Sequence, residues 1–136
     1  MTVPTVTRLG SGGPWEARYG YSRVVRAGDL AITAGCTSTV DGRVAHVGDA
    51  AAQTAQALRI GLAALAEVGA GPADVIRTRL YVTDRSHADE VGRAHQAVFG
   101  VVRPVATMVV VAGLIDEDHL VEVELEAYLP QQRIGS

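Results

Sequence analysis

Three glutamates alternate with apolar residues near the end of the chain. The alternation predicts a strand with apolar side chains on one face and carboxylates on the other, namely Val121, Val123 and Leu125 against Glu122, Glu124 and Glu126. Charged residues on a strand usually form a solvated face. A carboxylate that instead lines a cleft has a raised pKa and can act as a general acid or base. The pattern leaves both interpretations open.

Half of the six aromatic residues lie within seven positions near the start of the chain. These are Trp15, Tyr19 and Tyr21, and they stand next to the charged residues Glu16, Arg18 and Arg23. One interpretation is ordinary packing under a loop. The other is an aromatic wall with a charged partner, which suits an organic ligand.

Two further side chains have usable chemistry. Cys36 follows Gly35 at the end of a predicted strand, where a thiol could face a cleft, although single cysteines are more often inert small hydrophobes. Thr107 offers a hydroxyl group, but a threonine in a strand needs no functional reason.

The composition excludes several classes of chemistry. All 12 basic residues are arginine, so there is no lysine for a Schiff base, for pyridoxal phosphate or for a P-loop. The single cysteine excludes an intrachain disulfide and a multi-cysteine zinc site, and the four histidines show no ligand spacing. We therefore expect no metal and no cofactor. The net charge of -3 argues against strong nonspecific binding of nucleic acid.

The expected location is the cytoplasm. The first five residues lack the basic and apolar build of a signal peptide. No apolar run approaches the roughly 20 residues that a membrane span needs, so no membrane contact is expected. The chain has 136 residues and contains no linker or repeat, and residues 1–136 are therefore predicted to form one domain.

Hydrophobic periodicity and turn residues predict the elements that must position these side chains. A helix should begin at an Asp49 cap and end at the Gly69-Ala70-Gly71-Pro72 stretch, and a second should run from a Ser86 cap to Gly100. Asp41-Gly42 predicts a tight turn. The expected strands cover residues 3–8, 20–26, 30–35, 74–83, 105–112 and 119–128. This order predicts an α+β fold, a single mixed sheet with two helices on one face.

Two of the predicted strands carry further information. In residues 74–83, Val75, Arg77, Arg79 and Tyr81 are expected to share one face. Residues 108–112 are apolar on both faces, which is typical of a strand covered on both sides. Two helices can cover only one face of the sheet, so the other face must meet either the sheet's own curled edge or a neighbouring subunit. We expect the neighbouring subunit, because the sequence supplies no further element to cover that face.

Several short segments carry a further signal in their order and spacing. They are Gly20-Tyr21-Ser22-Arg23, Ile32-Thr33-Ala34-Gly35, Gln53-Thr54-Ala55-Gln56-Ala57-Leu58, Tyr81-Val82-Thr83-Asp84, Arg103-Pro104 and Val121-Glu122-Val123-Glu124. With these segments, the chain resembles the Rid family (YjgF-type, reactive intermediate deaminases) from about residue 14 to the C-terminus. The resemblance implies a chorismate-mutase-like homotrimer. Its sheets would form an inner β-barrel, its helices would lie outside, and three clefts between subunits would take a small metabolite.

The resemblance also implies a site and a reaction. Active family members hydrolyse enamine or imine intermediates to 2-keto acids and ammonia. The family's tyrosine falls on Tyr21, its strand-end glycine on Gly35 with Cys36 after it, and its glutamate on Glu122, or on Glu124 if the gap in the preceding loop is placed differently. Thr107 and Trp15 are further candidates for substrate binding.

One position departs from the family pattern. Pro104-Val105-Ala106 stands where the family has Pro-Ala-Arg, so Ala106 occupies the position of the arginine that clamps the substrate carboxylate. Arg23, Arg103 or Arg18 could replace it from another direction. Three hypotheses follow: an imine or enamine hydrolase for a substrate other than a simple 2-imino acid, a non-catalytic trimer that binds a small metabolite, and a ribonuclease or translation inhibitor.

Overall fold

The computed structural model describes residues 5–130. Its strands are β1 (Val6–Leu9), β2 (Val24–Ala27), β3 (Leu30–Thr33), β4 (Thr39–Val40), β5 (Arg43–Val44), β6 (Val75–Val82), β7 (Val105–Val110) and β8 (Val121–Tyr128). Its helices are α1 (Pro14–Tyr19), α2 (Ala50–Glu67) and α3 (Ala88–Phe99), with short 3-10 turns at Pro72–Asp74 and Arg85–His87. The predicted strand over residues 3–8 begins at Val6, and its residues 3 and 4 lie outside the described part of the chain.

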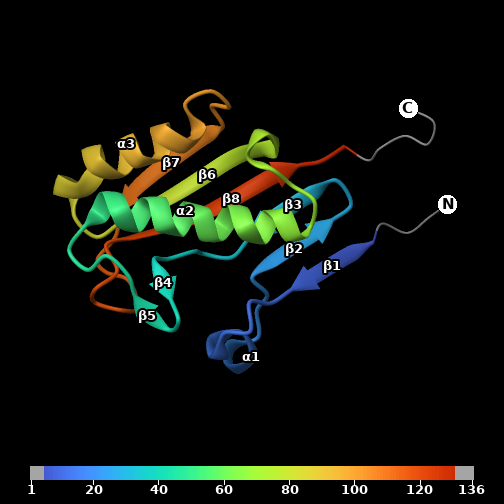
Figure 1. The fold of residues 1–136 in the computed structure, drawn as a ribbon, viewed down its shortest axis with the longest axis horizontal. Helices are drawn as coiled ribbons and strands as arrows, with labels where there is room; N and C mark the ends of the chain where they lie inside the picture. The colour runs from blue at the N-terminus through green and yellow to red at the C-terminus, as the bar shows by residue number, and fades with distance from the viewer. Residues whose placement is uncertain (1–4, 131–136) are drawn as a thin grey trace.

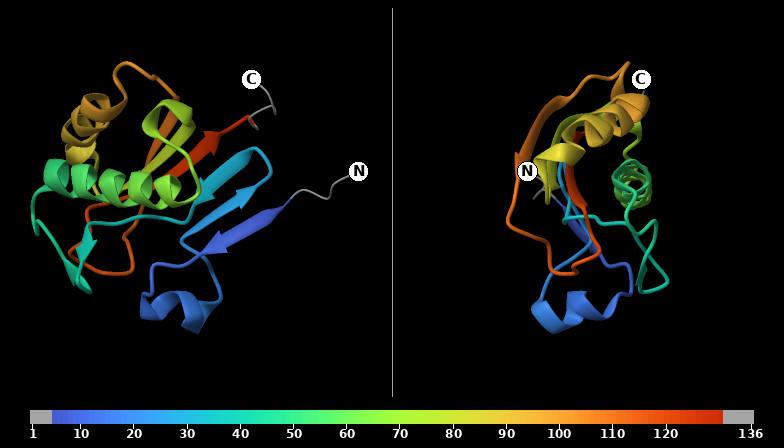
Figure 2. Two further views of the ribbon diagram at one scale, coloured as in Figure 1. Left: turned by 45° about the vertical axis from the view of Figure 1, so that its right-hand side comes forward. Right: turned by 90° about the vertical axis from the view of Figure 1, so that its left-hand side faces the viewer.

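Six of the strands form one mixed sheet in the order β1-β2-β3-β8-β6-β7, and β4 and β5 form a separate hairpin. Only β6 and β7 run parallel, and α3 connects them in the chain. Both α2 and α3 cover the same face of the sheet (Figures 1 and 2). The predicted α+β architecture, with two main helices on a mixed sheet, is confirmed.

The core lies between the sheet and these helices. One face of β8 is fully buried through Val121, Val123, Leu125 and Ala127, and it packs against α2 residues such as Leu58 and Leu65. Gly61 of α2 allows the close approach, because a Cβ atom there would lie 2.8 Å from the Leu125 side chain. We call the opposite side of the sheet the open face, since neither α2 nor α3 covers it (Figure 2).

Several predicted element ends are confirmed. Asp49 caps α2 by accepting a hydrogen bond of 3.0 Å from the Ala52 N–H, and α2 ends two residues before Gly69. Asp41 and Gly42 form the tight turn between β4 and β5, with φ of 52° and 76°. The two ends of α2 and the turn between β4 and β5 follow from local sequence alone.

Other local predictions were wrong. Ser86 does not cap the second helix. Its N–H instead donates to Asp84, which caps a 3-10 turn, and α3 begins at Ala88. Residues 20–23 are not part of a strand, because Gly20 takes a left-handed conformation that ends α1, and β2 starts at Val24.

A β-bulge changes the predicted faces of β6. The register shifts between Val75 and Arg77, which makes Ile76 the extra residue. Val75 therefore turns into the core while Ile76 is exposed, the reverse of the predicted assignment. Beyond the bulge the prediction is confirmed, since Arg77, Arg79 and Tyr81 share the open face.

β7 is an edge strand of the sheet, and no other strand of residues 5–130 pairs with its outer edge. It ends at Val110 rather than at residue 112, and Val105, Val109 and Val110 are exposed. Met108, which is partly buried, reaches toward Gly92 of α3.

Candidate functional site

The polar face of β8 lies on the open face of the sheet. Glu122, Glu124 and Glu126 are half-buried there, whereas the alternate residues of β8 are fully buried. The strict alternation predicted for this strand is therefore present, and it presents a row of three carboxylates.

Two of the three carboxylates are engaged by β6. The Tyr81 hydroxyl donates to Glu124, and this hydrogen bond raises the pKa of the tyrosine. Arg79 donates to Glu126 at 3.2 Å and lies 3.9 Å from Glu124, and Arg77 lies 3.8 Å from Glu126. Glu124 and Glu126 thus belong to an ion-pair network along the open face.

Glu122 lies in a different environment. It enters no ion pair or side-chain hydrogen bond within residues 5–130. Its carboxylate packs on Gly35, because a Cβ atom at that position would lie 2.7 Å from Glu122 Oε2. Burial raises the pKa of Glu122, repulsion from Glu124 raises it further, and the Arg23 charge opposes both effects. Of the two glutamates that the sequence left open, Glu122 is the one without an ion pair or side-chain hydrogen bond within residues 5–130.

Arg23 links the carboxylate to the strand end. Its Nη1 donates to the Gly35 carbonyl at 2.6 Å and lies 3.6 Å from the Cys36 Sγ. Its guanidinium also lies 6.0 Å from the centre of the Tyr21 ring. Arg23 thereby fixes the backbone on which the Glu122 carboxylate packs, and the N–H of Gly35 makes no hydrogen bond within residues 5–130.

Glu16 is a member of this site that the sequence did not single out. It is buried at the foot of α1 and lies 3.6 Å from the Arg23 Nε. Burial alone would raise its pKa, but hydrogen bonds from the Ser11 hydroxyl and N–H, together with the Arg23 charge, lower the pKa below the ordinary value. A glutamate within an exposed aromatic helix gives no sequence signal for this role.

Cys36 contributes its backbone rather than its thiol. The Cys36 N–H donates to the Val123 carbonyl at 2.7 Å, and the Val123 N–H donates back at 2.9 Å. The side chain is fully buried against Gly61 of α2, and burial raises the pKa of the thiol. The thiol therefore lies in the core, and the paired backbone holds the strand end beside Glu122.

Trp15 and Tyr19 are part of α1, and Tyr21 follows shortly after it. This helix lies beyond the end of the sheet (Figure 1). Trp15 and Tyr19 stack with their ring centres 5.6 Å apart, and the Arg18 guanidinium lies 5.5 to 5.6 Å from both rings. Tyr21 is next to Arg23. All three rings are more than two-fifths exposed, which makes them available to a ligand or a partner.

The remaining predicted site residues lie apart from this group. Thr107 lies on β7 opposite Arg79 of β6, and Ala106 lies on the same strand. β7 is the edge strand of the sheet, and β6 separates it from β8. Strands in a sheet are about 4.8 Å apart, so roughly 10 Å separate β7 from β8. Arg103 is exposed in the loop before β7 with φ of 57°. One chain thus gathers Tyr21, Arg23, Gly35, Cys36 and Glu122, but not Arg103, Ala106 or Thr107.

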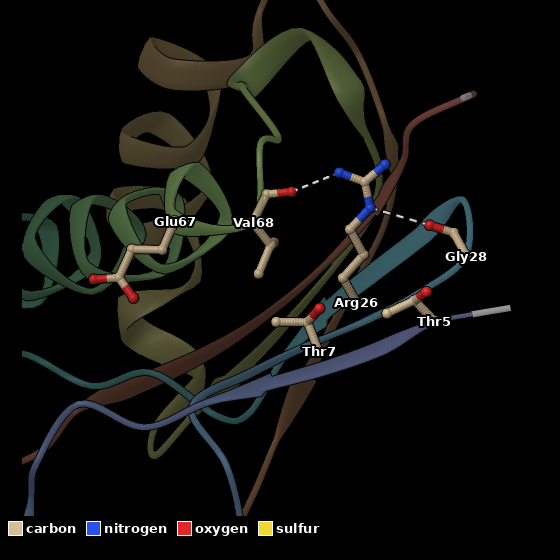
Figure 3. A pocket seen from close by; sticks show the side chains of 6 residues that line it. All are labelled: Thr5, Thr7, Arg26, Gly28, Glu67 and Val68. Atoms are coloured by element: carbon tan, nitrogen blue, oxygen red, sulfur yellow. Dashed lines mark hydrogen bonds between the residues drawn. The ribbon is translucent and has the colours of Figure 1, made fainter. Parts of the chain in front are cut away.

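A surface cavity lies elsewhere. It has a volume of about 380 Å³ and lies between β1, β2 and the end of α2, as Figure 3 shows. Arg26 donates there to the carbonyls of Val68 at 2.7 Å and of Gly28 at 3.0 Å. A cation at the C-terminal end of a helix compensates its unpaired carbonyls. This cavity is therefore a by-product of a helix cap.

Within residues 5–130 there is no group of three histidine, cysteine, aspartate or glutamate side chains that could hold a metal ion. None of the helices in this part of the chain has the length and apolar character needed to cross a membrane.

Comparison with known proteins identifies relatives over nearly the whole chain. An uncharacterised protein from Streptomyces coelicolor is 45% identical over 128 residues, which are 94% of this chain and 96% of that protein. A crystal structure from Mycobacterium tuberculosis, of a member of the YjgF/YER057c/UK114 family, is 47% identical with a TM-score of 0.84, covering 92% of this chain and 100% of that one. A crystal structure of a protein of unknown function from Pseudomonas aeruginosa is 26% identical, with a TM-score of 0.80 over 93% of this chain and 94% of that one.

The family comparison agrees with these matches. The sequence model of the family described as endoribonuclease L-PSP matches residues 14–129, which include both the Glu122 group and β7. The resemblance seen in the sequence is thereby confirmed, and the chain belongs to the endoribonuclease L-PSP family, the YjgF/YER057c/UK114 family.

Proposed function

We propose that this protein is a cytoplasmic homotrimer that hydrolyses imines or enamines in clefts between its subunits. The observation that carries the proposal is the state of Glu122, a half-buried carboxylate with a raised pKa, no ion pair within residues 5–130 and close packing on Gly35. Such a group can take a proton from water and return it to a leaving nitrogen. The proposed chemistry follows the resemblance to the Rid family.

The division of the site residues supports the inter-subunit arrangement. Tyr21, Arg23 and Glu122 lie together, while Thr107 and Ala106 lie on the edge strand β7. A second copy that brought its β7 to the Glu122 of the first would complete the site. The exposed apolar residues of the open face, including Ile32 and Val109, also favour burial by another copy.

In the proposed mechanism, Glu122 activates a water molecule for attack on the C=N carbon. Tyr21 and the N–H of Gly35, which makes no hydrogen bond within residues 5–130, would donate hydrogen bonds to the substrate or to the water. Arg23 is a positioning residue, because its guanidinium is engaged by Gly35 and Glu16. The exposed rings of Trp15 and Tyr21 would form the apolar wall.

The test compares Glu122→Gln with Glu124→Gln. Imines are generated in situ by an amino-acid oxidase or an amine oxidase, and the appearance of the carbonyl product is followed with and without the protein. Wild type and Glu124→Gln should accelerate at least one imine, and Glu122→Gln should lose at least 100-fold of that acceleration while keeping its assembly. Equal rates for wild type and Glu122→Gln would show that Glu122 is only a surface charge and has no part in the hydrolysis.

A non-catalytic trimer that binds a small metabolite is the second candidate, and the alanine at position 106 favours it. In that case no imine is accelerated, yet a ligand protects the trimer against thermal unfolding in a Glu122-independent way. Ribonuclease activity, which the family description names, is opposed by the carboxylate row on the open face and by the net charge of -3.

A further inference from the structure

The charges around Glu122 indicate which charge a substrate of this site should carry. Arg23 is the nearest cation, but its charge is compensated by Glu16, whose Oε2 lies 3.6 Å from the guanidinium Nε. Ser11 donates two hydrogen bonds to Glu16, of 2.9 and 2.5 Å, which favour the ionised carboxylate. The Arg79 cation is engaged in the same way by Glu124 and Glu126. Glu122 therefore has no cation of its own, because Arg23, whose charge lowers the Glu122 pKa, is shared with Glu16.

The strand that would complete the site adds no positive charge. The twelve residues from Pro104 to Ile115 contain no charged side chain, and this segment includes all of β7. This holds whichever copy of the chain supplies the strand. A substrate carboxylate placed between β7 and Glu122 would meet a like charge and no cation of the strand itself, and the first cation along the chain is Arg103, in the loop before Pro104.

The aromatic residues favour the opposite kind of ligand. The Tyr21 ring already holds the Arg23 guanidinium 6.0 Å from its centre, and the Trp15 and Tyr19 rings hold Arg18 at 5.6 and 5.5 Å. Exposed aromatic faces attract cations through their quadrupoles. Tyr21 is the ring that Arg23 joins to the Glu122 group. An exposed aromatic ring and a carboxylate without an ion-pair partner within residues 5–130 together suit a small organic cation.

We infer that the substrate is a small iminium ion without a carboxylate, of the kind formed when a primary amine, rather than an amino acid, is oxidised. This inference rests on the proposed function and specifies its substrate class. The positive charge of the C=N group is then matched by Glu122, and the missing arginine at position 106 is no defect because there is no carboxylate to clamp.

The reaction balances without a co-reactant other than water. Water attacks the iminium carbon and gives one proton to the Glu122 carboxylate. The product of this addition is a neutral carbinolamine. Glu122 returns this proton to the nitrogen, the C–N bond breaks with its electron pair on nitrogen, and the hydroxyl proton passes to the departing ammonia. One iminium ion and one water thus yield one aldehyde or ketone and one ammonium ion.

The experiment compares two imines made in situ under the same conditions. One is made from benzylamine by a flavin amine oxidase, and the other from an L-amino acid by an amino-acid oxidase, with catalase present in both. The readout is the acceleration of carbonyl release by the wild-type trimer. We expect the benzylamine imine to be accelerated at least tenfold more than the 2-imino acid.

The variant Ala106→Arg provides the converse. It should raise acceleration of the 2-imino acid at least tenfold and lower that of the benzylamine imine. Val101→Arg is the matched control. Val101 is 95% exposed in the turn before β7, so this substitution adds the same charge outside the site. It should leave both rates unchanged.

Two failures are distinguishable. If wild type prefers the 2-imino acid, the substrate class is wrong while the proposed hydrolysis stands, and Arg103→Gln and Arg23→Gln then identify the clamp. If neither imine is accelerated by wild type or by Ala106→Arg, the proposed function fails and the inference fails with it.

Discussion

The Glu122 carboxylate occupies the space that a side chain at position 35 would fill. A Cβ atom on Gly35 would lie 2.7 Å from Glu122 Oε2 and 2.8 Å from its Cδ. The glycine is therefore required by close approach and not by its conformation, since its φ is outside the left-handed region. The contact joins the end of β3 to β8, and Arg23 holds it in place through the Gly35 carbonyl.

Gly35→Ala should displace the Glu122 carboxylate and lower imine hydrolysis at least tenfold. The carboxylate is the flexible end of its side chain, so the free energy of unfolding should change by about 1 kcal/mol or less. Steady-state rates and urea unfolding measure the two effects. Gly113→Ala is the control, because a Cβ atom there meets nothing within 4 Å.

A shortened carboxylate should relieve the clash. In the Gly35→Ala background, Glu122→Asp should cost less activity than it does in wild type, which is a non-additive double-mutant cycle. Strict additivity of the two substitutions would show that the contact has no part in the activity.

The acid limb of the rate profile should follow the charges around Glu122. The ionised carboxylate is the base, so kcat/KM should rise with pH through a pKa above the ordinary glutamate value. Glu124→Gln removes a negative charge, lowers the Glu122 pKa and moves the limb to lower pH. Arg23→Gln removes a positive charge and moves the limb to higher pH. Shifts in the opposite directions would exclude Glu122 as the titrating group.

The open face should be the surface of assembly. Light scattering coupled to size exclusion should give three times the mass of one chain. Val109→Glu, on the open face of β7, should convert the trimer to smaller species, while Val101→Glu, in the exposed turn before β7, should not. A wild-type monomer at micromolar concentration would contradict the inter-subunit site.

Arg26 should matter for stability and not for activity. Arg26→Ala removes the two hydrogen bonds to Val68 and Gly28, and should lower the free energy of unfolding by about 1–2 kcal/mol for a half-buried guanidinium. Arg8→Ala, an exposed arginine on β1, should change it by less than about 0.5 kcal/mol. A loss of hydrolysis in the folded Arg26→Ala variant would assign the cavity of Figure 3 a function that its contacts do not indicate.

Local sequence signals predicted most of the fold. The Asp49 cap, the Asp41-Gly42 turn and the alternation of β8 each depend on neighbours in the chain, and the structure has all three. The bulge at Ile76 was not predictable in this way, because it depends on the pairing of β6 with β8. α1 was missed because six residues after a glycine-rich stretch give no hydrophobic period.

The site was predictable only in part. The sequence singled out Tyr21, Gly35 and Glu122 through the family resemblance, but left Glu122 and Glu124 as alternatives. What separates them is tertiary, since Tyr81 and Arg79 engage Glu124 whereas Gly35 packs on Glu122. The Glu16–Arg23 pair likewise joins α1 to the loop before β2, and no sequence pattern encodes it.

The proposed reaction depends on Glu122 being a carboxyl group that holds its proton to higher pH than an ordinary glutamate. A ¹³C NMR titration of the glutamate carboxyl carbons, with Glu122→Gln to assign the signal, measures this directly and needs no substrate. We expect a Glu122 pKa above the ordinary 4.5, and a lower Glu122 pKa in the Glu124→Gln variant than in wild type. A Glu122 pKa at or below 4.5 in the assembled protein would contradict it.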